Sequence, residues 1–76
     1  MEGLTEGRIV HYVLPNGSHV PAIVIKVWQK EAGTCNLHVF PDWANDGYPE
    51  GAFWATSIPP DFEDMKINSW HWIERA

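Results

Sequence analysis

Cysteine is almost absent from this sequence. Cys35 is the single cysteine among 76 residues, so no disulfide bond can form within the chain. This excludes the disulfide-stapled scaffolds on which many small secreted domains depend. The longest apolar stretch, residues 20–27, is interrupted by Pro21 and Lys26 and falls short of the roughly 20 residues that span a membrane. With no leader-like N-terminal stretch, we expect a cytoplasmic protein that has no membrane partner.

Basic residues are also few. Five Lys and Arg face ten Asp and Glu, which gives a formal net charge of −5 at pH 7. General nucleic-acid binding needs a basic surface that displaces counterions, so this balance argues against it. A local basic pocket for one small phosphorylated ligand stays possible. The acidic residues could imitate a nucleic-acid backbone, but their number is modest and a solvated surface explains them equally well.

Recognisable catalytic and metal-binding motifs are missing too. The glycines are scattered at turns, so none forms a phosphate-binding loop ahead of a helix. A Cys35 nucleophile with a histidine base would need an oxyanion hole and an orienting third group, and the sequence marks neither. His11, His19, His38 and Cys35 suggest a metal, but residues three apart on a strand face opposite sides, which separates Cys35 from His38. We therefore expect no enzyme, no cofactor and no metal site.

Aromatic residues are abundant. The chain has 5 Trp, 3 Phe and 2 Tyr, or 13% of its residues. A domain of this size buries only about 60% of its unfolded surface, and each buried aromatic side chain removes roughly 150–250 Å² from water. The tryptophans therefore contribute first to stability. A tryptophan indicates function only where the core cannot hold it.

The order of apolar, β-branched and turn-forming residues along the chain predicts short β-strands. Asn16-Gly17 is a strong hairpin signal, and it lies between two segments rich in β-branched and aromatic residues. Asp61–Met65 could form one short helical turn, and residues 42–51 form a long loop. Closing such strands into a barrel would remove exposed edges. We predict a small five-stranded SH3-like barrel over residues 7–76, behind a flexible lead-in at 1–6, with strands near 7–14, 20–28, 35–40, 52–58 and 69–75.

Several phrases occur together in order: GRIVHYVLPNG, PAIVIKVW, NLHVF, NDG, WATS and SWHW. This series resembles a group of short bacteriophage and prophage proteins, and the resemblance covers about residues 7–74. It implies a phage origin and the cytoplasm of an infected bacterium. It implies no activity and no functional residue. Small phage proteins outside the virion often act on host systems, which makes a counter-defence role a reasonable context.

The predicted ligand-binding residues are aromatic and basic. Trp43 and Tyr48 lie in the long loop, where they either form a recognition groove or fold back and bury themselves. Trp70 and Trp72 share one strand face and fill the core, unless one of them is exposed and stacks on a nucleobase. Phosphate would be held by basic side chains, which could equally be ordinary surface charges or partners of Glu74. The predicted set is Trp43, Tyr48, Trp54, His71, Arg8, Lys26 and Arg75.

Two functions fit these residues. The first is sequestration of a small nucleotide-derived immune signal by a homo-oligomer, because one small barrel encloses little concave volume. The second is a protein-interaction module that holds a host protein or peptide in an aromatic groove. Converging Arg or Lys would favour the phosphorylated ligand, and an acidic rim would favour a basic or proline-rich partner. An enzyme and a virion component remain further alternatives.

Overall fold

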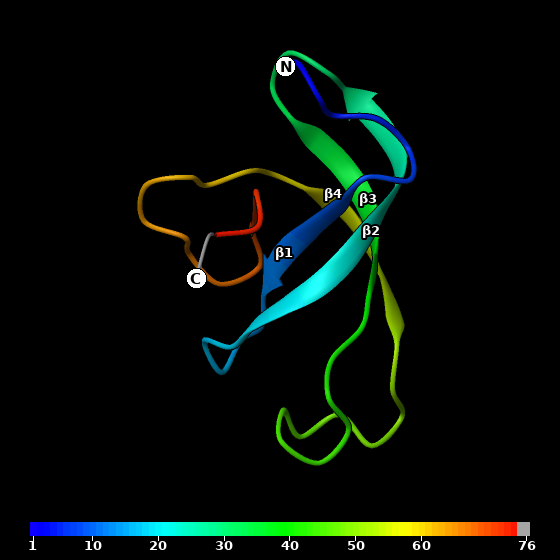
Figure 1. Ribbon diagram of the computed structural model, residues 1–76, viewed down its shortest axis with the longest axis vertical. Helices are drawn as coiled ribbons and strands as arrows, with labels where there is room; N and C mark the ends of the chain where they lie inside the picture. The colour runs from blue at the N-terminus through cyan, green and yellow to red at the C-terminus, as the bar shows by residue number, and fades with distance from the viewer. Residues whose placement is uncertain (75–76) are drawn as a thin grey trace.

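The computed structural model describes residues 1–74, which form one five-stranded antiparallel sheet and no helix (Figure 1). The order of strands in the sheet is β4-β3-β2-β1-β5. The predicted all-β class is confirmed, but the sheet is open, with β4 and β5 at its edges, and does not form a closed barrel. No helix in residues 1–74 could cross a membrane. The strands are β1 (Ile9–Val13), β2 (His19–Gln29), β3 (Thr34–Val39), β4 (Phe53–Ile58) and β5 (Trp70–His71).

The predicted hairpin joins β1 to β2. The Asn16 side-chain oxygen accepts a hydrogen bond from the Ser18 backbone N–H at 2.9 Å, and Gly17 has φ +89°. A turn with positive φ favours glycine, because other side chains are strained there. The hairpin sets Val13 opposite His19 and continues to Ile9 opposite Ile23. A local turn signal therefore fixes the register of the two strands.

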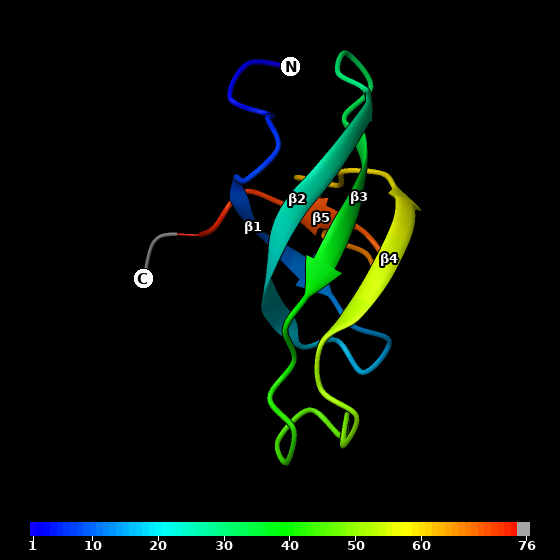
Figure 2. The same ribbon diagram turned by 90° about the vertical axis from the view of Figure 1, so that its right-hand side faces the viewer.

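The core lies on one face of the strongly twisted sheet (Figure 2). Alternate residues of the strands point to it, as the period of two in a β-strand requires. Trp70 is fully buried, and its indole N–H donates to the Gly33 carbonyl at 2.7 Å. The residues of the core cluster are Leu4, Val10, Tyr12, Leu14, Val20, Ala22, Val24, Cys35, Leu37, Val39, Ala55, Ile58 and Trp70.

The last strand is much shorter than predicted. Residues 69–75 were expected to be extended, whereas β5 contains only Trp70 and His71. One edge of β5 pairs with β1, and its other edge forms an isolated parallel bridge to Pro60. Pro59 and Pro60 have no backbone N–H, so they cannot extend this ladder. The C-terminal segment is therefore joined to the sheet by very few backbone contacts.

Two smaller expectations also differ from the structure. The lead-in at residues 1–6 is not loose at Leu4, which is fully buried in the core. The Glu6 carboxylate adds a hydrogen bond from the Val27 N–H at 2.9 Å. The segment after Pro60 is a bend and not a helical turn. Asp61 organises it, because its carboxylate accepts backbone N–H bonds from Asp64 and Lys66.

Candidate functional site

The outer side of the sheet, opposite the core, carries a row of apolar and aromatic side chains that are exposed at the two ends and half-buried at Ile23 and His38. Ile9 lies opposite Ile23, Ile23 opposite His38, and His38 opposite Trp54, so the row crosses four strands. Ile9 is 51% exposed and Trp54 is 63% exposed. Phe40 stacks on His38 with ring centroids 4.9 Å apart. We call these five residues the outer patch, and none of them carries a fixed charge.

The two loop aromatics have different environments. Tyr48 stacks on Phe53 at 5.4 Å and packs against the core, so it matches the alternative in which the loop buries its own ring. Trp43 is 63% exposed and remains available to a ligand. Their loop projects from the end of the sheet where β3 stops and β4 starts, at the bottom of both ribbon views (Figures 1 and 2). Trp43 and Trp54 are therefore the exposed members of the predicted aromatic set.

The structure places two of the predicted phosphate-binding residues, Arg8 and Lys26, against different tryptophans. The Arg8 guanidinium lies 4.8 Å from the centre of the Trp72 ring, and the Lys26 amine lies 5.4 Å from that of Trp28. These cation–π contacts hold the two basic groups on separate tryptophans. Arg75 lies outside the described residues. A hollow of about 470 Å³ is lined by Gln29 at the end of β2 and by the turn residues Lys30, Glu31 and Ala32.

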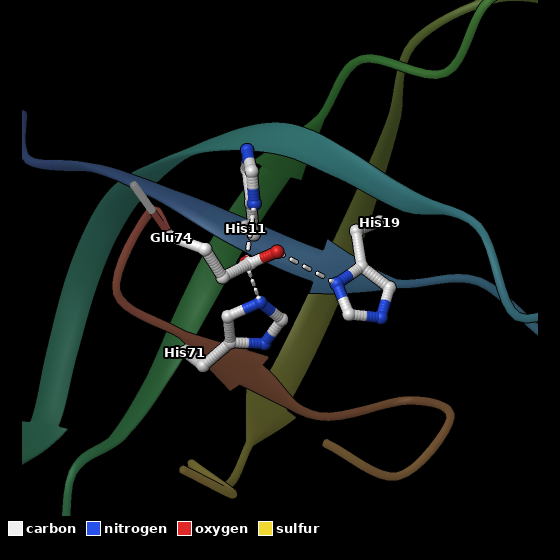
Figure 3. Close-up of side chains that lie close together, drawn as sticks. All are labelled: His11, His19, His71 and Glu74. Atoms are coloured by element: carbon white, nitrogen blue, oxygen red, sulfur yellow. Dashed lines mark hydrogen bonds and ion pairs between the residues drawn. The ribbon is translucent and has the colours of Figure 1, made fainter. Parts of the chain in front are cut away.

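Three histidines and one glutamate meet on the outer side of the sheet (Figure 3). His11 on β1 lies directly opposite His71 on β5, and His19 extends from the start of β2. The Glu74 carboxylate lies among the three rings. His11 Nδ1 is 2.8 Å from Glu74 Oε1, His19 Nδ1 is 3.3 Å from Oε2, and His71 Nε2 also contacts Oε1. We call these four residues the histidine cluster.

The histidine cluster is partly buried, and its single carboxylate lies among three imidazole rings. The His71 side chain is 3% exposed, whereas that of Glu74 is 41% exposed. Hydrogen bonding from His11 first, and then from His71, lowers the pKa of Glu74 from its ordinary value of 4.5 to about 2. His71 Nδ1 is buried without a hydrogen-bond partner in the described part of the chain. Leaving a buried polar atom unpaired costs about 1–3 kcal/mol.

The lowered pKa of Glu74 predicts weaker folding in acid. The folded protein holds the Glu74 carboxylate ionised more strongly than the unfolded chain does, so the free energy of unfolding should decrease as pH falls from about 4.5 towards 2. Urea denaturation at a series of pH values measures this change. Glu74→Gln removes the ionisable group and should flatten the curve in that window. Parallel pH curves for the two proteins would contradict the assignment.

The histidine cluster can donate four ligand atoms to one metal ion. One atom from each residue lies within 4.8 Å of the others. Sequence reasoning identified His71 as a site residue but did not group it with His11, His19 and Glu74. The first and last strands of small barrels are commonly neighbours, and this rule could have indicated the cluster. In this structure the pairing of β1 with β5 brings His11 beside His71.

Cys35 and His38 are on opposite sides of the sheet, as the strand period predicts. Cys35 is fully buried, and its burial raises the pKa of the thiol to about 11. The thiol is therefore protonated at neutral pH. His38 belongs to the outer patch. Neither Cys35 nor His38 belongs to the histidine cluster.

Comparisons with protein-family models, with curated proteins and with solved structures found no match to this chain.

Proposed function

We propose that this chain is a non-enzymatic recognition module that binds another protein through its outer patch. The observation that carries the proposal is the row of apolar and aromatic side chains that crosses four strands, with its ends Ile9 and Trp54 exposed. Contiguous exposed apolar surface on a soluble domain commonly marks an interaction site. Exposed tryptophan is also the residue type most enriched among energetically dominant interface contacts. Trp54 and Phe40 would be the main anchors.

The distribution of charge supports a basic partner. Between residues 31 and 65 there are seven acidic residues and no Lys or Arg. Asp42, Asp46 and Glu50 lie in the loop that precedes β4, and Asp61 follows shortly after it. Complementary charge around an apolar centre favours the matching partner and speeds its association. This excess of acidic residues in the segments that flank β4 favours a basic partner over a phosphorylated ligand.

The edge strand β4 suggests how the partner would bind. Its sequence, FWATSI, contains no Lys and no Pro, the residues that commonly protect exposed edges. An extended segment could add to such an edge through backbone hydrogen bonds, while alternate side chains contact Trp54. The order of the five strands supports an SH3-like arrangement, a fold class in which aromatic surfaces hold extended peptides. The resemblance to phage proteins supports a partner in the host cytoplasm.

Site-specific photocrosslinking tests the outer patch. A photoreactive phenylalanine replaces Trp54 in one version of the protein and the exposed Glu63 in a control version. We expect a discrete protein adduct at position 54 and none at 63. An excess of wild-type protein should suppress this adduct, whereas an excess of Ile23→Ser protein should not. Equal labelling at the two positions, or competition by both proteins, would contradict the proposal.

Sequestration of a nucleotide-derived signal by a homo-oligomer stays a prediction. Arg8 and Lys26 stack on separate tryptophans, and this arrangement does not favour a shared phosphate pocket. A thermal-shift screen against cyclic nucleotides and ADP-ribose derivatives separates the two functions. A ligand bound only by the folded protein, at 100 times its Kd, stabilises it by about 2.7 kcal/mol. A selective shift would favour sequestration over protein recognition.

A further inference from the structure

The donor atoms of the histidine cluster converge from three strands and the C-terminal segment (Figure 3). Two of the donors are Nδ1 atoms, from His11 and His19, and one is the Nε2 atom of His71. Each of these nitrogens faces the same carboxylate. Three imidazoles and one carboxylate form a nitrogen and oxygen ligand set that suits Zn²⁺ and related transition-metal ions.

The backbone holds these donors in place before any ion binds. His11 and His71 are directly paired across β1 and β5, so their side chains must leave the sheet on the same side. The β1–β2 hairpin fixes His19 opposite Val13, two residues beyond His11 on the same ladder. Glu74 follows His71 by three residues. The rings of His19 and His71 are edge-to-face with centroids 4.8 Å apart, which limits their reorientation.

The spacing of the donors is close to that of a tetrahedral site. Zinc binds imidazole nitrogen and carboxylate oxygen at about 2.0–2.2 Å, which sets neighbouring donors roughly 3.4 Å apart. The His11–Glu74 and His19–Glu74 donor distances are 2.8 and 3.3 Å, and the largest separation in the cluster is 4.8 Å. Small side-chain adjustments would bring the four donors to this spacing. Glu74 has room to move, because it is 41% exposed.

We propose that His11, His19, His71 and Glu74 bind one zinc ion, which fastens the C-terminal segment to the sheet. Four protein ligands are typical of structural zinc, whereas catalytic zinc keeps a position for water. Little strand pairing holds the C-terminal segment to the sheet. β5 contains two residues, and the chain's one cysteine is buried in the core. A metal ion that joins residues 11 and 74 closes a long loop of the chain and thereby stabilises the folded state. This stabilisation acts where the backbone pairing is shortest.

Metal titration of the tag-free protein tests this proposal. The protein is stripped with a chelator, dialysed and titrated with Co²⁺, whose visible spectrum reports tetrahedral coordination. We expect one equivalent of Co²⁺ to bind and Zn²⁺ to displace it. Zinc at a free concentration of 100 times its Kd should raise Tm by about 10–20 °C. Absence of tetrahedral Co²⁺ binding and of a Zn²⁺-dependent shift in Tm would overturn the proposal.

Matched variants locate the ion. His19→Ala and Glu74→Gln change partly exposed ligands and should fold, and each should lower zinc affinity by about 100-fold or more, since loss of an outer-shell partner alone costs about 10–100-fold. His38→Ala removes a histidine from the same face outside the cluster and should retain wild-type affinity. Equal losses in His38→Ala and His19→Ala, or no loss in His19→Ala and Glu74→Gln, would show that zinc binds elsewhere.

Discussion

Trp70→Ala is expected to lower the free energy of unfolding by about 3–5 kcal/mol, a large share of the stability of a domain this small. Trp70 is fully buried and packs edge-on against Trp72 and Phe62, with ring centroids 4.9 and 5.5 Å away. Truncation leaves a cavity that the open sheet cannot refill. It also leaves the Gly33 carbonyl without the indole N–H that now donates to it at 2.7 Å. Urea denaturation measures the loss.

Trp54→Ala is the matched control for Trp70→Ala. The chemical change is the same, but Trp54 is 63% exposed on the outer patch. Surface substitutions of this kind usually change the free energy of unfolding by less than about 0.5 kcal/mol. A similar loss of stability in both variants would mean that Trp70 does not hold the core together.

Gly33→Ala is expected to destabilise the fold by about 2–5 kcal/mol. Gly33 has φ +82°, a left-handed conformation that costs a residue with a Cβ atom about 1–2 kcal/mol. An added Cβ would also lie 2.7 Å from Pro60 Cγ and 2.9 Å from Met1 Cε. The methionine can move, but the proline ring is held beside β5 by its bridge to Trp70. Overpacking of this kind adds about 1–3 kcal/mol.

Gly47→Ala separates the cost of backbone strain from the cost of the steric overlap. Gly47 has φ +73°, and a Cβ there meets no atom within 4 Å. Alanine at this position therefore carries the backbone strain without the collision. Thermal and urea denaturation of the two variants should show the larger loss for Gly33→Ala. Equal losses would indicate that Pro60 moves aside, and that the turn between β2 and β3 is not tightly packed against β5.

The amino-acid sequence determined the local features of this protein by itself. Asn16-Gly17 specified the first hairpin because Gly17 adopts the positive φ that this turn requires. The alternation in residues 35–40 placed Leu37 and Val39 in the core, because successive side chains of a strand point to opposite faces. The short segments rich in β-branched and aromatic residues, separated by turns, predicted an all-β class. Each of these inferences depends on residues close together in the chain.

The tertiary structure alone decided the histidine cluster and the extent of the last strand. His11 and Glu74 are 63 residues apart, and their contact depends on β5 pairing with β1 and not on any local spacing. β5 pairs with β1 along one edge while Trp70 bonds with Pro59 and Asp61 along the other, and the strand contains only Trp70 and His71. Whether an aromatic side chain is buried depended on neighbouring strands as well, since Trp70 and Trp54 are chemically alike. Contacts between distant segments arise from chain packing, and a sequence pattern does not encode them residue by residue.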